Sequence, residues 1–138
     1  MTKTALITGA SKRVGLSITK HLASKGFNIA IHYNTSESDS KKIVNELKKK
    51  KIKVERFKLD LAKTNSIKSF FTKIKNHFGK IELLVNNASV FEYDSLKSSS
   101  MKSYNKHMDI NLKAPFFLSK YFHEYLGNKK GNIINILD

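Results

Sequence analysis

The 138-residue sequence has no cysteine, no tryptophan, one proline and two arginines. Without cysteine there is neither a disulfide framework nor a thiolate metal site, and we expect no bound metal. No apolar run approaches the length of a membrane span. The chain passes from Met1 almost directly into an apolar segment, so we expect no secretory leader. We therefore expect a cytoplasmic protein without a membrane partner.

Negative charge is also scarce. Asp and Glu number 11 against 26 Lys and Arg, which gives a formal net charge of +15. Such a charge can indicate a polyanionic partner. Proteins that read a nucleic-acid sequence favour arginine for its two parallel hydrogen bonds, and arginine occurs here only at Arg13 and Arg56. We interpret the lysines as a solvated surface and expect no specific nucleic-acid partner.

What the sequence does contain is an alternation of strand and helix patterns over one domain, residues 1–138. We expect strands over the ranges 4–7, 27–31, 53–59, 81–85 and 133–137. We expect helices over 14–25, after a capping-box-like pair of Ser36 and Asp39, over 67–78 and over most of 101–126. The alternation predicts an α/β fold with right-handed crossovers and a parallel sheet. No helix follows the fifth expected strand, so we expect the sheet to be truncated there.

The segment Thr8 to Gly15 reads T-G-A-S-K-R-V-G and joins the first expected strand to the first expected helix. A turn at this point aims backbone N–H groups and the positive helix end at a pyrophosphate. Gly9 permits a tight turn, and Gly15 permits close packing of the helix on the strand. The alternative is a plain strand-to-helix turn that needs one glycine. We expect cofactor contacts from Gly9, Ser11, Lys12, Arg13, Val14 and Gly15.

Arg13 stands where the usual dinucleotide fingerprint has glycine. The string resembles the T-G-x-x-x-R-x-G variant of the pteridine reductases, a branch of the short-chain dehydrogenase/reductase family. The resemblance implies a Rossmann-type doubly wound sheet of strand order 3-2-1-4-5, of which this chain holds roughly the first half of a family domain. It also implies that Arg13 lies along the cofactor phosphates, which a guanidinium suits.

The second expected strand is followed by the string H-Y-N-T-S at 32–36. A site selective for NAD places a carboxylate here to accept from the ribose 2′-OH, and none occurs at His32, Tyr33 or Asn34. We therefore expect NADP. The string resembles the corresponding pteridine-reductase segment, and we expect contacts from His32, Tyr33, Asn34 and Ser36. The alternative is an ordinary polar loop.

Two further strands end in polar residues. The resemblance implies that Asp60, with Leu61 beside it, contacts the adenine, although a helix cap is the alternative. After the fourth strand, the string N-N-A-S resembles the family's N-N-A-G and implies cofactor contacts from Asn87, Ala88 and Ser89. Turn chemistry is the alternative for the paired asparagines. Phe91 stands where pteridine reductases place a ring over the pterin, or it belongs to the core.

Two catalytic candidates lie later in the chain. Pro115 has no N–H to offer the carbonyl four residues back, which belongs to Asn111, and the alternative is a simple kink. The resemblance implies that this carbonyl holds a water in a proton relay. It also places Asp138 where pteridine reductases have an acid beside the substrate, and an Asp there can move protons to ring nitrogens.

The family's catalytic Tyr-x-x-x-Lys pair is expected after the fifth strand. The two such strings present, Tyr93 to Lys97 and Tyr125 to Lys129, lie before that strand, and neither is interpreted as catalytic. We therefore expect the 138 residues alone to be inactive, with self-association expected of the complete domain. The preferred function is NADP-dependent hydride transfer to a pterin-like substrate. The alternatives are reduction of a keto group, as in a 3-oxoacyl substrate, and nucleotide binding without catalysis.

Overall fold

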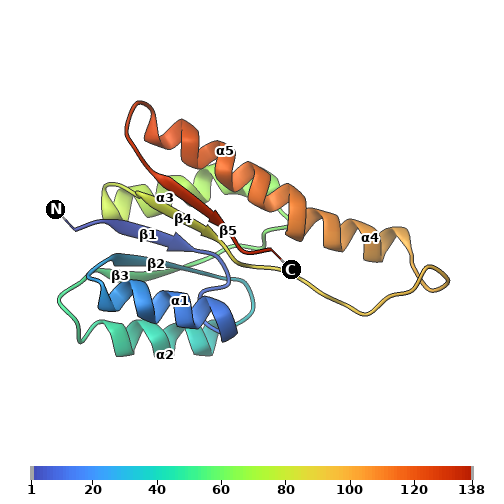
Figure 1. Ribbon diagram of the computed structural model, residues 1–138, viewed down its shortest axis with the longest axis horizontal. Coiled ribbons are helices and arrows are strands. Elements are labelled where there is room, and N and C mark those ends of the chain that lie inside the picture. The colour runs from blue at the N-terminus through green and yellow to red at the C-terminus, as the bar shows by residue number, and fades with distance from the viewer. Residues whose placement is uncertain (1, 138) are drawn as a thin grey trace.

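The computed structural model describes residues 2–137, and within them five parallel strands form one sheet (Figure 1). The strands are β1 (Thr4–Ile7), β2 (Asn28–Tyr33), β3 (Val54–Lys58), β4 (Leu83–Asn86) and β5 (Asn132–Asn135). Their order across the sheet is β3-β2-β1-β4-β5, with all four neighbouring pairs parallel. This confirms the expected order 3-2-1-4-5. It also places the reversal of strand order between β1 and β4.

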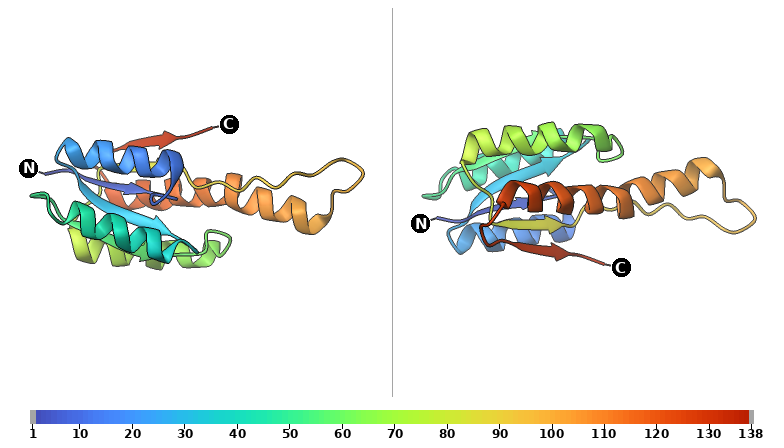
Figure 2. Two further views of the ribbon diagram at one scale, coloured as in Figure 1. Left: turned by 90° about the horizontal axis from the view of Figure 1, so that it is seen from below. Right: turned by 90° about the horizontal axis from the view of Figure 1, so that it is seen from above.

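Helices cover both faces of the sheet, as a doubly wound fold requires. One face carries α1 (Arg13–Ser24) and α2 (Glu37–Leu47), and the other carries α3 (Ile67–Phe78) and α5 (Ala114–Leu126) (Figure 2). A short 3-10 helix, Thr64–Ser66, leads into α3. The helix α4 (Met101–Met108) joins α5 through a π-helical turn, Asp109–Lys113, and projects beyond the sheet (Figure 1).

Two buried clusters hold these layers together, because alternate residues of a strand point to opposite faces. Ala5 and Ile7 of β1 pack with α1 and α2, whereas Leu6 between them packs with α3 and α5. Phe70 and Phe122 are among the largest side chains of the second cluster, and both are buried. Full burial of one such side chain contributes about 1.5–3 kcal/mol. The core thus forms around the centre of the sheet and leaves the strand ends open.

The structure corrects some local predictions. Strand β2 continues to Tyr33, two residues beyond the expected end, and β5 ends at Asn135 rather than at 137. The capping box is wrong, because the Ser36 side chain makes no cap bond at the start of α2. Instead, the backbone N–H of Ser40 donates to the Ser36 carbonyl. Within residues 2–137, no helix combines the length and the apolar character needed to cross a membrane.

Candidate functional site

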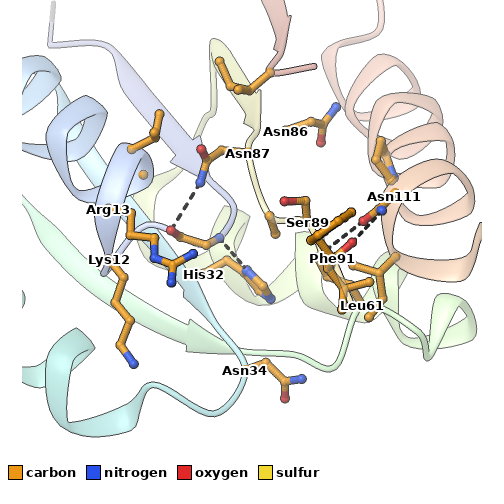
Figure 3. Close-up of a pocket in the computed structure, with 18 of the residues that line it drawn as sticks. Lys12, Arg13, His32, Asn34, Leu61, Asn86, Asn87, Ser89, Phe91 and Asn111 are labelled. Atoms are coloured by element: carbon orange, nitrogen blue, oxygen red, sulfur yellow. Dashed lines mark hydrogen bonds between the residues drawn. The ribbon is translucent and has the colours of Figure 1, made fainter. Parts of the chain in front are cut away.

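The carboxyl ends of the strands meet at one edge of the sheet, where a groove of about 1180 Å³ lies (Figure 3). Open α/β sheets bind ligands in this position, at the reversal of strand order. Most of the residues predicted for the site line the groove: Gly9, Ser11, Lys12, Arg13, Val14, Gly15, His32, Tyr33, Asn34, Ser36, Leu61, Asn87, Ala88, Ser89, Phe91 and Asn111. Lys12 and Arg13 lie on one side, and Phe91 and Asn111 lie across from them (Figure 3).

The N-terminus of α1 opens onto this groove without a cap of its own. Lys12, the N-cap residue, has an extended backbone and makes no side-chain cap bond, and the first turn holds no acidic residue. The first N–H groups of a helix have no partner within the helix, and they carry a partial positive charge. This end of α1 is therefore suited to an anion such as a phosphate.

Gly15 packs against the turn so closely that no other residue fits. A Cβ atom at this position would lie 2.1 Å from the Gly9 carbonyl oxygen and 2.5 Å from Nδ2 of Asn87. Gly9 itself has a φ of +61°, in the left-handed region that favours glycine. The two predicted glycine roles, a tight turn and close helix packing, thus both occur in the structure.

Among the residues that the structure describes, Arg13 is the one non-glycine residue with a positive φ, at 48°. Left-handed backbone costs roughly 1–2 kcal/mol for a residue with a Cβ, which explains why glycine suits this position. A cation in the first turn of a helix is also unfavourable with respect to the helix dipole. Neither the backbone conformation at position 13 nor the dipole of α1 therefore favours arginine. Strained residues of this kind gather at ligand sites.

His32 is buried beneath the turn and holds it in place. Its Nδ1 accepts from the Gly9 N–H at 3.1 Å, and its Nε2–H donates to the Leu59 carbonyl at 2.9 Å. This pairing fixes the neutral tautomer with the proton on Nε2, and burial lowers the pKa of His32 to about 4. Both ring nitrogens are thus engaged within the protein, and the expected contact of His32 with a cofactor stays a prediction. Its role here is to position Gly9.

Asn87 and Thr8 join the ends of β1 and β4. The Asn87 side chain donates to the carbonyl oxygens of Thr8, at 2.9 Å, and Gly9, at 3.3 Å. The Thr8 hydroxyl in turn accepts from the N–H groups of Asn87 and Ala88, each at 2.9 Å. Asn87 and Thr8 therefore tie together the two loops that follow β1 and β4. Thr8 was not among the predicted site residues, although it begins the motif.

The end of β2 is more acidic than its sequence indicated. No carboxylate follows β2 directly, but a carboxylate oxygen of Asp39 in α2 lies 3.2 Å from the Lys12 ammonium. Tyr33 is buried, and its hydroxyl accepts from Arg56 at 3.1 Å. Arg56 also pairs with Glu37 at 3.4 Å. Asp39 and Glu37 thus each have a cationic partner.

Among the predicted residues that the structure describes, Asp60 is the one that does not line the groove. The Asp60 carboxylate accepts from the backbone N–H of Ala62 at 3.1 Å, which is turn chemistry, while its neighbour Leu61 reaches the groove. Asp138 lies outside the described residues. Contacts of either residue with a ligand therefore stay predictions.

Asn111 lies in the π-helical turn, close to the predicted irregularity at Pro115. The Ala114 N–H donates to the Asp109 carbonyl five residues back, and Pro115 has no N–H for the Asn111 carbonyl. The Asn111 side chain clamps the loop after β4, because it both donates to and accepts from the Val90 backbone at 2.8 Å. This clamp was not predicted. It holds the base of the loop that carries Phe91, which is 82% exposed.

A polar cluster that was not predicted lines the groove beside β5. Asn86 of β4 and Asn135 of β5 are register partners, and Nδ2 of Asn86 donates to Oδ1 of Asn135 at 2.8 Å. Asn86 also donates to Ser119 of α5 at 3.3 Å. The signal available in the sequence was the first asparagine of the N-N-A-S string. Its partners are far along the chain and meet it only in the folded sheet.

Comparison with known proteins identifies the family of this chain. The family model for short chain dehydrogenases matches residues 3–137. The 3-oxoacyl-(acyl-carrier-protein) reductase FabG of Staphylococcus epidermidis is 32% identical over 137 residues, which are 99% of this chain and 56% of that protein. The chain thus spans about half the length of the curated relatives it matches.

Solved structures of short-chain dehydrogenases and reductases also resemble this chain. FolM alternative dihydrofolate reductase 1 from Brucella canis, complexed with NADP, superposes with a TM-score of 0.92 and 31% identity, over 99% of this chain and 55% of that one. A short chain dehydrogenase from Burkholderia cenocepacia, in complex with NADP, gives 0.91 and 27%, over 96% and 54%. Both of these neighbours hold NADP, the cofactor that the end of β2 predicts. The sheet order, the loop between β1 and α1 and these matches together establish that this chain belongs to the short-chain dehydrogenase family.

Proposed function

We propose that this chain holds NADPH in the groove and forms the cofactor-binding part of a reductase. The observation that carries the proposal is the uncapped N-terminus of α1, which opens onto the groove beside Gly9. The residues present fit a dinucleotide. Gly15 lets α1 approach the turn, and the neutral His32 ring holds Gly9 in its left-handed conformation. Bound NADPH would supply a hydride, and the chain's own residues would hold the cofactor in place.

The proposed division of work follows the geometry of the groove. Arg13 and the N–H groups of the first turn of α1 would hold the pyrophosphate. Lys12, with Asn34 and Ser36, would hold the 2′-phosphate at the mouth of the groove. The Lys12 ion pair with Asp39 is half-exposed and therefore weak, so a phosphate can compete for the lysine. Asn111 would hold the loop after β4 through Val90 and so fix the edge of the substrate site.

For the substrate we propose a pterin-like molecule, such as a dihydropteridine or dihydrofolate. Phe91 supports this, because its ring is exposed in the wall of the groove and a flat heterocycle can stack on it. The similarity to a structure described as an alternative dihydrofolate reductase points the same way. Asp138 is proposed as a proton-transfer residue, on the resemblance alone.

Reduction of a keto group is the second candidate, and one observation favours it. Curated relatives at 32% identity are 3-oxoacyl-(acyl-carrier-protein) reductases. Under either function we propose a cytoplasmic enzyme that uses a small-molecule substrate and associates with itself when the domain is complete. The exposed apolar side chains of β5, including Ile133 at 41% and Ile134 at 46%, support association.

The cofactor proposal predicts that NADPH binds more tightly than NADH by about tenfold or more, because the 2′-phosphate gains charge-assisted hydrogen bonds. Arg13→Gly should weaken both cofactors by a similar factor, since both carry the pyrophosphate. Glycine accepts the φ of 48°, so this variant loses the guanidinium without losing the turn. The measurement is titration by nicotinamide fluorescence, with urea unfolding as the control. Equal affinity for NADH, or unchanged affinity in Arg13→Gly, would contradict the assignment.

The substrate proposal predicts that NADPH-saturated protein binds dihydrofolate, and that Phe91→Ala weakens this binding about fivefold to tenfold through loss of ring stacking. Binding of NADPH itself should stay unchanged. Leu96→Ala is the matched control, because Leu96 is 99% exposed on the same loop and does not line the groove. Isothermal titration with dihydrofolate and with an acetoacetyl thioester separates the two candidate functions. Binding of the thioester alone would favour keto reduction.

A further inference from the structure

The edge of the sheet opposite the groove, where the strands begin, is strongly basic. Parallel strands bring every helix-to-strand turn to this amino edge, on the left of Figure 1. The turns and the N-terminal segment comprise residues 2–3, 25–27, 48–53, 79–82 and 127–131. They contain one carboxylate, Glu82, and ten lysines: Lys3, Lys25, Lys48, Lys49, Lys50, Lys51, Lys53, Lys80, Lys129 and Lys130. Ten positive charges against one negative place +9 of the net +15 here.

The charge at the amino edge faces solvent. Nine of its ten lysines are exposed, and Lys80, which is partly buried, pairs with Glu82 at 2.7 Å. Beyond these segments, the chain carries only the remaining +6 of the net charge. The lysines are therefore not spread evenly as a solvating coat. The fold collects them on one side, away from the groove.

Stabilisation of helix ends does not account for this concentration. Four helices, α1, α2, α3 and α5, end at the amino edge, and each C-terminus carries about −0.5 of an elementary charge. About two positive charges would balance all four dipoles, whereas the edge carries a net +9. The segment 48–53 alone places five lysines after one helix. A large uncompensated charge remains, and its self-repulsion is a cost that an anionic partner would remove.

The shape of the amino edge indicates the kind of anion. Its turns follow the strand order in a row, and strands lie about 4.8 Å apart, so the row is roughly 19 Å long. Among the described residues, none of the exposed large apolar side chains lies in these turns. The edge thus lacks a side chain to insert into a bilayer or to stack on unpaired bases. A row of point charges fits a linear polyanion, and a duplex presents one charge per about 1.7 Å of its axis.

We propose that the amino edge binds the phosphate backbone of a nucleic-acid duplex without reading its sequence. Lysine contacts phosphate as a point charge, and the absence of arginine from this edge removes the side chain best suited to base readout. The proposal replaces the interpretation of these lysines as a solvated surface, and it involves no sequence-specific partner. The groove and the amino edge lie at opposite ends of the strands, so a duplex and a dinucleotide can be bound together.

The test is fluorescence anisotropy of a labelled DNA duplex of about 20 base pairs, titrated with the chain at several salt concentrations. With about five phosphates neutralised, the logarithm of the binding constant should fall by about 4.5 per tenfold rise in salt. Neutralising four lysines of the amino edge should weaken binding at low salt about tenfold or more and make the slope shallower by about 3.6. That variant is Lys48→Gln with Lys49→Gln, Lys50→Gln and Lys51→Gln. The pair Lys129→Gln with Lys130→Gln provides a second, smaller step on another turn.

The matched control removes the same net charge from other parts of the surface, at exposed lysines outside the amino edge and the groove: Lys63, Lys68, Lys73 and Lys97, each to Gln. It should keep most of the binding and the slope, and urea unfolding verifies that each variant folds. Saturating NADPH and the Arg13→Gly substitution should leave duplex binding unchanged. The NADPH titration therefore tests the cofactor proposal independently of duplex binding. Equal loss in the control would overturn the proposal in favour of diffuse charge. Tighter binding to phosphatidylserine vesicles than to the duplex would overturn it in favour of a membrane surface.

Discussion

Gly15→Ala is expected to destabilise the fold by about 3 kcal/mol and to weaken NADPH binding about a hundredfold or more. The added Cβ would lie 2.1 Å from the Gly9 carbonyl oxygen and 2.5 Å from Nδ2 of Asn87. The first of these is a backbone atom, held by the contact of Gly9 N–H with His32. The clash can be relieved only if α1 moves away from the turn. That movement separates the helix N-terminus from the groove.

The control for this prediction is Gly26→Ala at the other end of α1. Gly26 has a φ of +83° but no atom within 4 Å of an added Cβ, so alanine there adds backbone strain without a clash. We expect a loss of about 1 kcal/mol and unchanged NADPH affinity. Urea unfolding and NADPH fluorescence measure the two quantities. If Gly15→Ala and Gly26→Ala behave alike, the close packing of α1 on the turn has no special role.

Acidification is expected to remove about 3 kcal/mol of stability through His32 alone. Burial lowers its pKa from 6.5 to about 4 in the folded state. Between these values the unfolded chain takes up a proton that the folded chain refuses, so protons favour unfolding. The contribution of His32 is therefore complete above pH 6.5 and is lost progressively as the pH falls towards 4. Protonation of Nδ1 would also break its hydrogen bond with the Gly9 N–H.

The measurement is urea unfolding at steps from pH 7 to pH 4, compared between the parent chain and His32→Gln. Glutamine stays neutral, and its amide offers an acceptor and a donor in place of the two ring nitrogens. The variant should be less stable at pH 7 by roughly 1–3 kcal/mol, and this difference should shrink as the pH falls. His21→Gln, at an exposed position on α1, is the matched control and should leave the stability at pH 7 nearly unchanged. Parallel curves for the parent and His32→Gln would show that His32 does not titrate as proposed.

The local pattern of the sequence was enough to predict the alternation of elements and the parallel sheet. Apolar runs of strand length and stripes such as Phe70, Phe71 and Ile74 at helical spacing reflect burial of one side of each element, which is a local property. The strand order 3-2-1-4-5 followed from the family resemblance carried by Gly9, Arg13 and Gly15. The positions of the glycines also indicated the phosphate site, because a tight turn and close packing restrict the residue type.

Only the tertiary structure decided which polar groups hold the site together. The sequence alone is compatible with His32 as an ordinary polar loop residue. In the structure, its buried and neutral ring joins Gly9 to Leu59 through two hydrogen bonds. The Asn111 clamp on Val90 and the Asn86–Asn135 pair join residues from distant parts of the chain, and no local spacing encodes those contacts. The lysines of the amino edge likewise come from five separate segments of the sequence. Parallel crossovers return each strand to the same side, so the fold gathers charges that the sequence keeps apart.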